Sequence, residues 1–84
     1  MSDTGWRERD GALVREIAMR DFDDASTLLN RIAAAAVDHF RRPDMCISEH
    51  SHVRITVANP HHAGITEAET RLAAKVDAVV RDHA

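Results

Sequence analysis

The fifteen residues from Asp44 to Ala58, DMCISEHSHVRITVA, have the clearest periodicity in the sequence. Apolar side chains recur at every second position on both sides of a polar turn at 49–51, which is the period of a half-buried β-strand. The inward-facing set is Met45, Ile47, Val53, Ile55 and Val57. The stretch therefore predicts an antiparallel β-hairpin with one apolar face, and Arg54 and Thr56 are expected on the other face.

A further strand is expected upstream, from Ala12 to Met19 (ALVREIAM). Its β-branched residues and the preceding Gly11 favour a strand, although its alternation is imperfect. Trp6 is expected in a shorter strand that pairs with it.

The period changes at Phe22, where apolar residues begin to step by three or four, as along one side of an α-helix. The apolar stripe consists of Phe22, Ala25, Leu29, Ile32, Ala36 and Phe40. It predicts a helix of about five turns. Asp21, Asp23 and Asp24 lie at its start, where carboxylates suit the unpaired N–H groups and the positive end of the dipole. Pro43 is expected to end the helix.

A second helix is expected from Ile65 to Val80. Thr66 and Glu69 have the spacing of a capping box, in which each residue satisfies a backbone N–H of the first turn. Its inward stripe is Leu72, Val76 and Val79.

The order strand, strand, helix, strand, strand, helix predicts an α+β fold, with a four-stranded antiparallel sheet and two helices packed on one face. The other face is expected to be polar, and at least one edge strand should be open to another subunit. The 84 residues are expected to form a single domain with an ordered core from about 6 to 80. A domain this short buries only about 60% of the surface of its unfolded chain, so a partner or self-association is expected.

The composition argues against several classes of function. Eleven Lys and Arg against fourteen Asp and Glu give a net charge of −3, so no nucleic-acid partner is expected. No apolar run is long enough to span a membrane, and no apolar signal segment is present. We therefore expect a cytoplasmic protein. The single cysteine, Cys46, lies in an apolar run and is expected to be a buried thiol rather than a nucleophile.

Six histidines raise the question of a metal site. His50 with His52, and the adjacent His61 and His62, come nearest to ligand pairs, but no Cys or acidic residue stands at a recognised zinc spacing. Solvated turn histidines are the simpler interpretation. Neither a metal nor a cofactor is expected.

Arg41 and Arg42 stand side by side just before Pro43. Guanidinium groups bind carboxylates and phosphates through paired hydrogen bonds. Arginine near a helix C-terminus is also favoured by the helix dipole alone. The residues themselves leave both interpretations open.

The chain from about Trp6 to Val80 resembles the pterin-4a-carbinolamine dehydratase family. The resemblance rests on four segments: RDF at 20–22, RRPDMCIS at 41–48, VRITVANPHHAGIT at 53–66 and EAETRLAAKVDAV at 67–79. It covers nearly the whole chain, and the family's order of elements is the one predicted above.

The resemblance also implies that the catalytic site is lost. Arg41 and Arg42 fall where the family has two adjacent catalytic histidines, and Pro60 falls where it has the third. The family's reaction removes water from a 4a-hydroxytetrahydropterin by general acid–base catalysis, which needs groups that titrate near neutral pH. His61 follows Pro60 by one residue, and on a strand that shift points a side chain to the opposite face. No catalytic residue is therefore expected.

Three functions follow from the resemblance. The first is a non-catalytic interaction protein, similar to degenerate relatives that act as Rubisco assembly factors or chaperones of the α-carboxysome. It implies a homodimer or dimer of dimers that binds the Rubisco large subunit, in the cytoplasm or with the carboxysome. Arg41, Arg42 and Trp6 are the candidate partner-binding residues.

The second function is a residual dehydratase that uses His39, His61 or His62. The third is a dimerisation cofactor of another protein, by analogy with relatives that bind homeodomain transcription factors through helices. For that role the first helix would present Asp24, Asn30 and Arg31 on its outer face, and the alanines at 33–36 would leave room for close helix approach.

Overall fold

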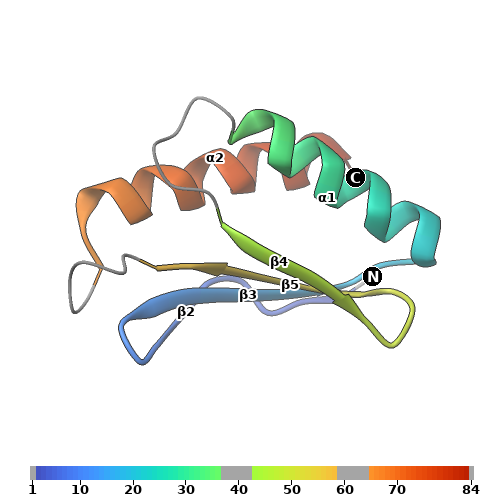
Figure 1. The fold of residues 1–84 in the computed structure, drawn as a ribbon, viewed down its shortest axis with the longest axis horizontal. Helices are drawn as coiled ribbons and strands as arrows, with labels where there is room; N and C mark the ends of the chain where they lie inside the picture. The colour runs from blue at the N-terminus through green and yellow to red at the C-terminus, as the bar shows by residue number, and fades with distance from the viewer. Residues whose placement is uncertain (1, 37–42, 59–64, 84) are drawn as a thin grey trace.

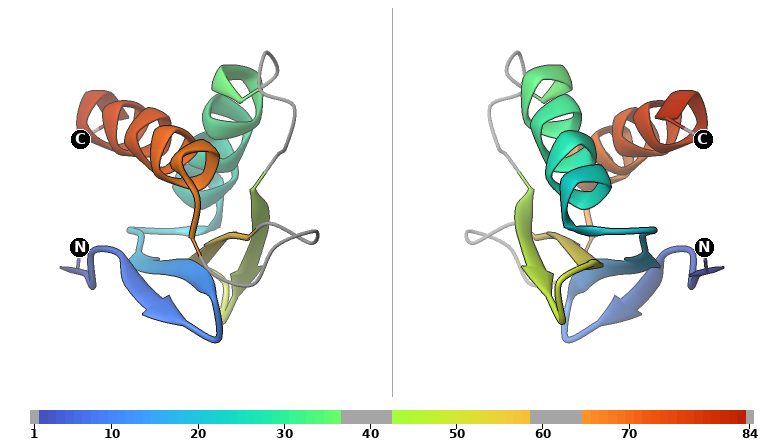
Figure 2. Two further views of the ribbon diagram at one scale, coloured as in Figure 1. Left: turned by 90° about the vertical axis from the view of Figure 1, so that its left-hand side faces the viewer. Right: turned by 90° about the vertical axis from the view of Figure 1, so that its right-hand side faces the viewer.

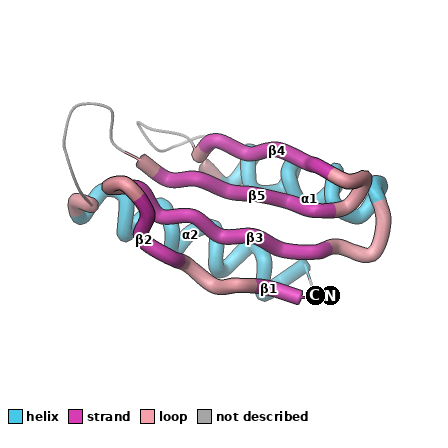
Figure 3. The backbone as a smooth tube through the Cα atoms, turned by 90° about the horizontal axis from the view of Figure 1, so that it is seen from below, coloured by secondary structure: helices cyan, strands magenta, loops and turns pink. Residues whose placement is uncertain are grey.

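The computed structural model describes residues 2–36, 43–58 and 65–83 of the chain. It confirms the predicted α+β fold in two layers. One layer is an antiparallel sheet and the other consists of two helices, which lie side by side on the same face of the sheet (Figures 1 and 2). On the opposite face of the sheet, which we call the open face, the described residues place no helix (Figure 3).

The sheet is built from five strands, all antiparallel to their neighbours. They are β1 (Ser2–Asp3), β2 (Arg7–Arg9), β3 (Ala12–Ala18), β4 (Asp44–Ser48) and β5 (His52–Val57). The order across the sheet is β1-β3-β5-β4, and β2 also pairs with β3. Because β1 and β2 pair with successive parts of β3, they occupy a single edge position, and the sheet is four strands wide.

Two tight turns fix the register of the strands. Asp10 and Gly11 join β2 to β3 with φ values of 53° and 80°. Positive φ at both central residues is the condition for the type I′ turn, whose twist matches that of a two-residue hairpin. In the β4–β5 hairpin Ile47 lies opposite Val53, and Met45 lies opposite Ile55. The predicted apolar face is therefore confirmed.

Helix α1 (Phe22–Ala35) begins as the sequence predicts. Asp21 is the N-cap, and its side chain accepts a hydrogen bond from the backbone N–H of Asp24 at 2.8 Å. The helix ends earlier than predicted, with Ala36 as its C-cap. A run of alanines has no side chain that marks a helix end, so the sequence pointed instead to Pro43.

Phe22 does not belong to the buried stripe, which corrects the sequence prediction. Its side chain is 54% exposed because it occupies the first position of the helix, before α1 has crossed onto the sheet. The buried positions of the helix are Ala25, Leu28 and Ile32. Leu28 replaces Leu29 as the central contact, since Leu29 is only partly buried.

Helix α2 (Glu67–His83) continues past its predicted end at Val80. Val79 of the predicted inward stripe is only partly buried, and the neighbouring Val80 is buried instead. The backbone N–H of Thr66 donates to the Glu69 carboxylate at 2.9 Å, which is one half of the predicted capping box. Leu72 and Val76 are buried. None of the helices in the part of the chain described here has the length and apolar character needed to cross a membrane.

The core lies between the two layers. Its fully buried side chains come from both helices and from the central strands β3 and β5. They include Ile17, Leu28, Ile32, Val53, Ile55 and Val76. Burial of one such side chain contributes about 1.5–3 kcal/mol relative to exposure, so this cluster holds the two helices against β3 and β5.

Cys46 is exposed, and the prediction of a buried thiol is wrong. Its neighbours Met45 and Ile47 face the helices, and successive residues of a strand point to opposite faces. Cys46 therefore lies on the open face, opposite Arg54 of β5. The apolar run around it had concealed the alternation.

Candidate functional site

Of Trp6, Arg41, Arg42 and Pro60, only Trp6 falls within the described ranges. Arg41, Arg42 and Pro60 lie outside them, as do His39, His61 and His62. The replacement of the family's histidines at Arg41, Arg42 and Pro60 is therefore a conclusion from the sequence alone.

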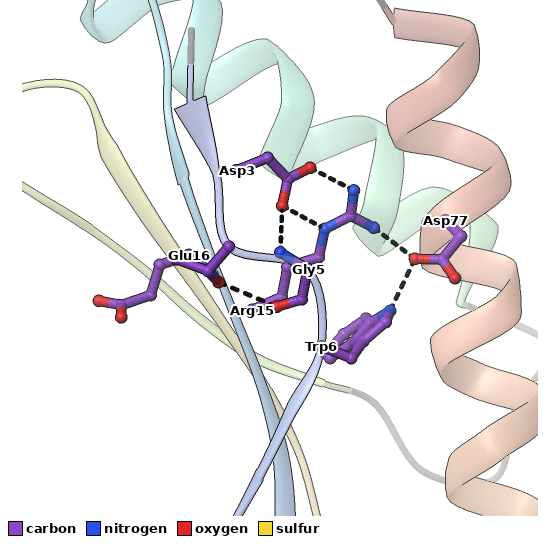
Figure 4. A network of polar contacts seen from close by, with 7 residues as sticks. Asp3, Gly5, Trp6, Arg15, Glu16 and Asp77 are labelled. Atoms are coloured by element: carbon purple, nitrogen blue, oxygen red, sulfur yellow. Dashed lines mark hydrogen bonds and ion pairs between the residues drawn. The ribbon is translucent and has the colours of Figure 1, made fainter.

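Trp6 precedes β2 and faces the helices. Its indole N–H donates to a carboxylate oxygen of Asp77, on α2, at 2.6 Å (Figure 4). Its ring packs against both parts of the apolar core. The Arg15 guanidinium lies 5.9 Å from the ring centroid, within the range of a cation–π contact. Trp6 thus links the sheet edge to α2, and its role as a partner contact stays a prediction.

Arg15 is the centre of this polar group. Its side chain lies on the helix side of β3, is only 12% exposed, and is paired with both Asp3 of β1 and Asp77 of α2. The Arg15 hydrogen bonds hold the pKa of Asp3 below its usual value of 3.8, against the opposing effect of burial. The same pairing raises the pKa of Arg15. An arginine at an inward position requires such partners, because an unpaired buried charge is costly.

The backbone of residues 3–5 completes the contact between β1 and β3. The Thr4 N–H donates to the Glu16 carbonyl at 3.0 Å, and the Glu16 N–H donates to the Thr4 hydroxyl at 3.1 Å. Gly5 follows with a φ of 68° and donates its N–H to Asp3 at 2.9 Å. This left-handed residue turns the chain from β1 into β2.

A shallow hollow of about 390 Å³ opens beside this group. It is lined by Gly5, Trp6, Arg15, Asp77, Val80 and Arg81. Its Arg15 charge is already matched by two carboxylates, and the indole N–H has its acceptor. The arrangement therefore stabilises the fold, and the Arg15 and Trp6 donors beside the hollow already have their acceptors.

The open face carries a second polar group, centred on Glu16 of β3. The Glu16 carboxylate lies 2.9 Å from Arg7, 3.0 Å from His52 and 3.5 Å from Arg54. The hydrogen bond from His52, followed by the charges of Arg54 and Arg7, lowers the pKa of Glu16 below its usual 4.5. One carboxylate thus holds the heads of three basic side chains together.

A third polar group joins the two helices. His83 of α2 lies 2.8 Å from the Asp24 carboxylate and 3.2 Å from the Arg31 guanidinium. The bond to His83 lowers the pKa of Asp24. Asp24 therefore faces α2, which corrects the prediction that it lies on the outer face of the first helix, whereas Arg31 is exposed and reaches His83 with its guanidinium. Asn30 is exposed.

No group of three His, Cys, Asp or Glu side chains is placed to hold a metal ion in the ranges that the structure describes. His52 contacts Glu16, and His50 lies exposed in the β4–β5 turn, where its φ is 70°. His61 and His62 lie outside those ranges.

Sequence reasoning missed both the Arg15 group and the Glu16 group. Arg15 and Asp77 are 62 residues apart, so their pairing has no local pattern. One signal was available: Arg15 stands between Leu13 and Ile17 on the inward face of a strand. A charged residue at such a position predicts a carboxylate opposite it.

Comparison with known proteins places this geometry in a family. A family model described as pterin 4 alpha carbinolamine dehydratase matches residues 1–79. A provisionally named pterin-4-alpha-carbinolamine dehydratase from Metallosphaera sedula is 31% identical over 72 residues, covering 86% of this chain and 74% of the relative. One from Thermomicrobium roseum is 32% identical over 72 residues, covering 86% and 76%.

Two solved structures are similar. A transcriptional coactivator/pterin dehydratase from Brucella melitensis has a TM-score of 0.74 and 28% identity, covering 90% of this chain and 82% of that one. A pterin dehydratase-like protein identified as a RuBisCO assembly factor in the alpha-carboxysome has a TM-score of 0.68, covering 88% and 84%. At 23% identity, the second shows a shared fold.

The family match extends over nearly the whole chain, and the solved relatives have the same arrangement of sheet and helices. The chain belongs to the pterin-4a-carbinolamine dehydratase family.

Proposed function

We propose that this chain is a non-catalytic member of its family that acts by binding another protein. The observation that supports this most strongly is the occupancy of three sequence positions, Arg41, Arg42 and Pro60, where the family resemblance places histidines. Guanidinium stays protonated in proteins and proline has no titratable side chain. Neither can exchange a proton with a hydroxypterin near neutral pH.

We further propose that the client is Rubisco, through its large subunit, and that the chain assists Rubisco assembly in the cytoplasm or at the carboxysome. A protein of this fold has been identified as a RuBisCO assembly factor in the alpha-carboxysome, and that likeness supports the proposal. Arg41 and Arg42 are the proposed anchors, because arginine pairs carboxylates through two parallel hydrogen bonds.

An affinity purification tests the client and the arginine pair together. The tagged chain and its Arg41→Ala/Arg42→Ala variant are incubated with purified Rubisco large subunit, and the bound subunit is quantified. The control is Arg71→Ala/Lys75→Ala, which removes the same charge from exposed positions of α2. We expect capture by the parent chain and the control but not by the Arg41/Arg42 variant. No capture by the parent chain would contradict the proposed client.

A residual dehydratase is the second candidate, favoured by the provisional names of the curated relatives. It would have to use His39, His61 or His62, since these are the histidines near the altered positions. A one-residue shift along a strand reverses the direction of a side chain, which weighs against His61 as a replacement.

A further inference from the structure

The open face of the sheet is accessible and basic, in a chain that is acidic overall. Strand register assigns its side chains, because residues opposite one another share a face. Its basic residues are Arg7, Arg9, His52 and Arg54, and its acidic residues are Glu16 and Asp44. Three arginines against two carboxylates give +1, whereas the whole chain has −3.

The basic side chains of this face are held close together. Arg7, His52 and Arg54 all contact the same carboxylate, that of Glu16, at 2.9 to 3.5 Å. Glu16 neutralises one positive charge, so the cluster that it forms with Arg7, His52 and Arg54 keeps a net positive charge. The Arg54 side chain is still 57% exposed, which leaves guanidinium N–H groups available for a further acceptor.

Charge also restricts what can cover this face. Two copies of the chain that met open face to open face would bring faces of the same net charge together, which disfavours that pairing. A long polyanion such as duplex DNA requires a wide basic surface, and the remaining described surface is acidic. An acidic segment of a partner protein is small enough to cover this face, and its charge is opposite to that of the basic side chains there.

We propose that the open face is a docking surface for an acidic segment of a partner protein, with Arg54 and Arg7 as the principal contacts. This surface is separate from Arg41 and Arg42. The inference rests on the proposed function in that the chain works by binding, but it does not require the client to be Rubisco.

Fluorescence anisotropy with a fluorescein-labelled decaglutamate peptide at low salt tests the proposal. The key comparison is Arg54→Glu against Arg71→Glu. Both variants change the net charge from −3 to −5, but Arg71 lies on α2, 70% exposed and paired with Glu67 at 2.5 Å. We expect Arg54→Glu to weaken peptide binding at least about tenfold and Arg71→Glu to change it less than about twofold.

Two further measurements separate the remaining outcomes. Titration of the ¹⁵N-labelled parent chain with the peptide should shift amide signals of β3 and β5 and leave those of α2 unchanged, which does not depend on any variant folding. A 20-base-pair DNA duplex should bind more weakly than the peptide. Equal losses for the two variants, amide shifts confined to the helices, tighter binding of the duplex, or no peptide binding would each overturn the proposal. Because the assay contains no Rubisco, its failure is independent of the proposed client.

Discussion

Arg15 occupies an inward position of β3 that an apolar residue would ordinarily fill, and three residues from other elements compensate for it. Asp3 and Asp77 pair with its guanidinium, and Trp6 lies against it. Arg15→Gln removes the charge and leaves the two carboxylates without an ion-pair partner, although Trp6 still donates to Asp77 and Gly5 to Asp3. We expect a loss of about 2 kcal/mol in the free energy of unfolding, measured by urea denaturation.

Arg7→Gln is the matched control for this prediction. Arg7 makes one ion pair, with Glu16, and its side chain is 54% exposed, so its removal should cost less than about 1 kcal/mol. Equal losses for the two variants would show that the inward position of Arg15 has no special weight.

The carboxylates predict how stability depends on pH. Asp3, Glu16 and Asp24 have pKa values below their usual 3.8 to 4.5 because Arg15, His52 and His83, respectively, bond to them. A lowered folded-state pKa favours folding at every pH above the usual value, and this contribution is lost as the pH falls through the lowered value. The free energy of unfolding should therefore hold down to about pH 4.5 and decline below it.

Urea midpoints recorded at a series of pH values check this dependence. Glu16→Gln should reduce the decline below pH 4.5, whereas Glu8→Gln, at an exposed position of β2, should leave it unchanged. A parent chain that gained stability on acidification would contradict the assignment.

At the level of elements, the N-terminus of α1 depends on one cap. The Asp21 side chain accepts from the Asp24 N–H at 2.8 Å. Asp21→Ala should cost about 1 kcal/mol of unfolding free energy, and Asp23→Ala, which removes the same charge without removing a cap, should cost less than half of that. Thermal unfolding followed by circular dichroism measures both, and a larger loss for Asp23→Ala would be inconsistent with the cap.

The helices and strands could be predicted where the spacing of apolar residues, or a capping residue, marked the element clearly. The β4–β5 hairpin and the first turns of α1 and α2 follow from alternation, from Asp21, and from Thr66 with Glu69. The two-residue strand β1 could not be predicted, because contacts with distant residues hold it against β3. The Thr4 N–H bonds to the Glu16 carbonyl, and Asp3 pairs with Arg15. These contacts span more than ten residues of sequence and leave no periodic trace.

At the level of the whole molecule, the open edge of β4 predicts self-association. β5 is the one strand that pairs with β4 in the described part of the chain. An unpaired strand edge presents backbone donors and acceptors to another chain. Sedimentation equilibrium should give about twice the 9.3 kDa chain mass, and a strict monomer would contradict this expectation.

The candidate site was less predictable than the fold. The sequence predicts Trp6 as a partner contact, whereas the structure shows that its indole N–H joins the sheet to α2. The basic group on the open face depends on Arg7, His52 and Arg54, which come from two strands and meet only through pairing with β3. Sequence shows the face of each strand, but not which strands become neighbours.

The central claim is that the chain binds and does not catalyse. The most direct test is the rate at which the purified chain dehydrates a 4a-hydroxytetrahydropterin at neutral pH, compared with buffer alone. Because Arg41, Arg42 and Pro60 cannot transfer a proton, we predict a rate equal to that of buffer. Turnover above buffer that is lost in His61→Ala would contradict the account and make the chain a dehydratase with a relocated histidine.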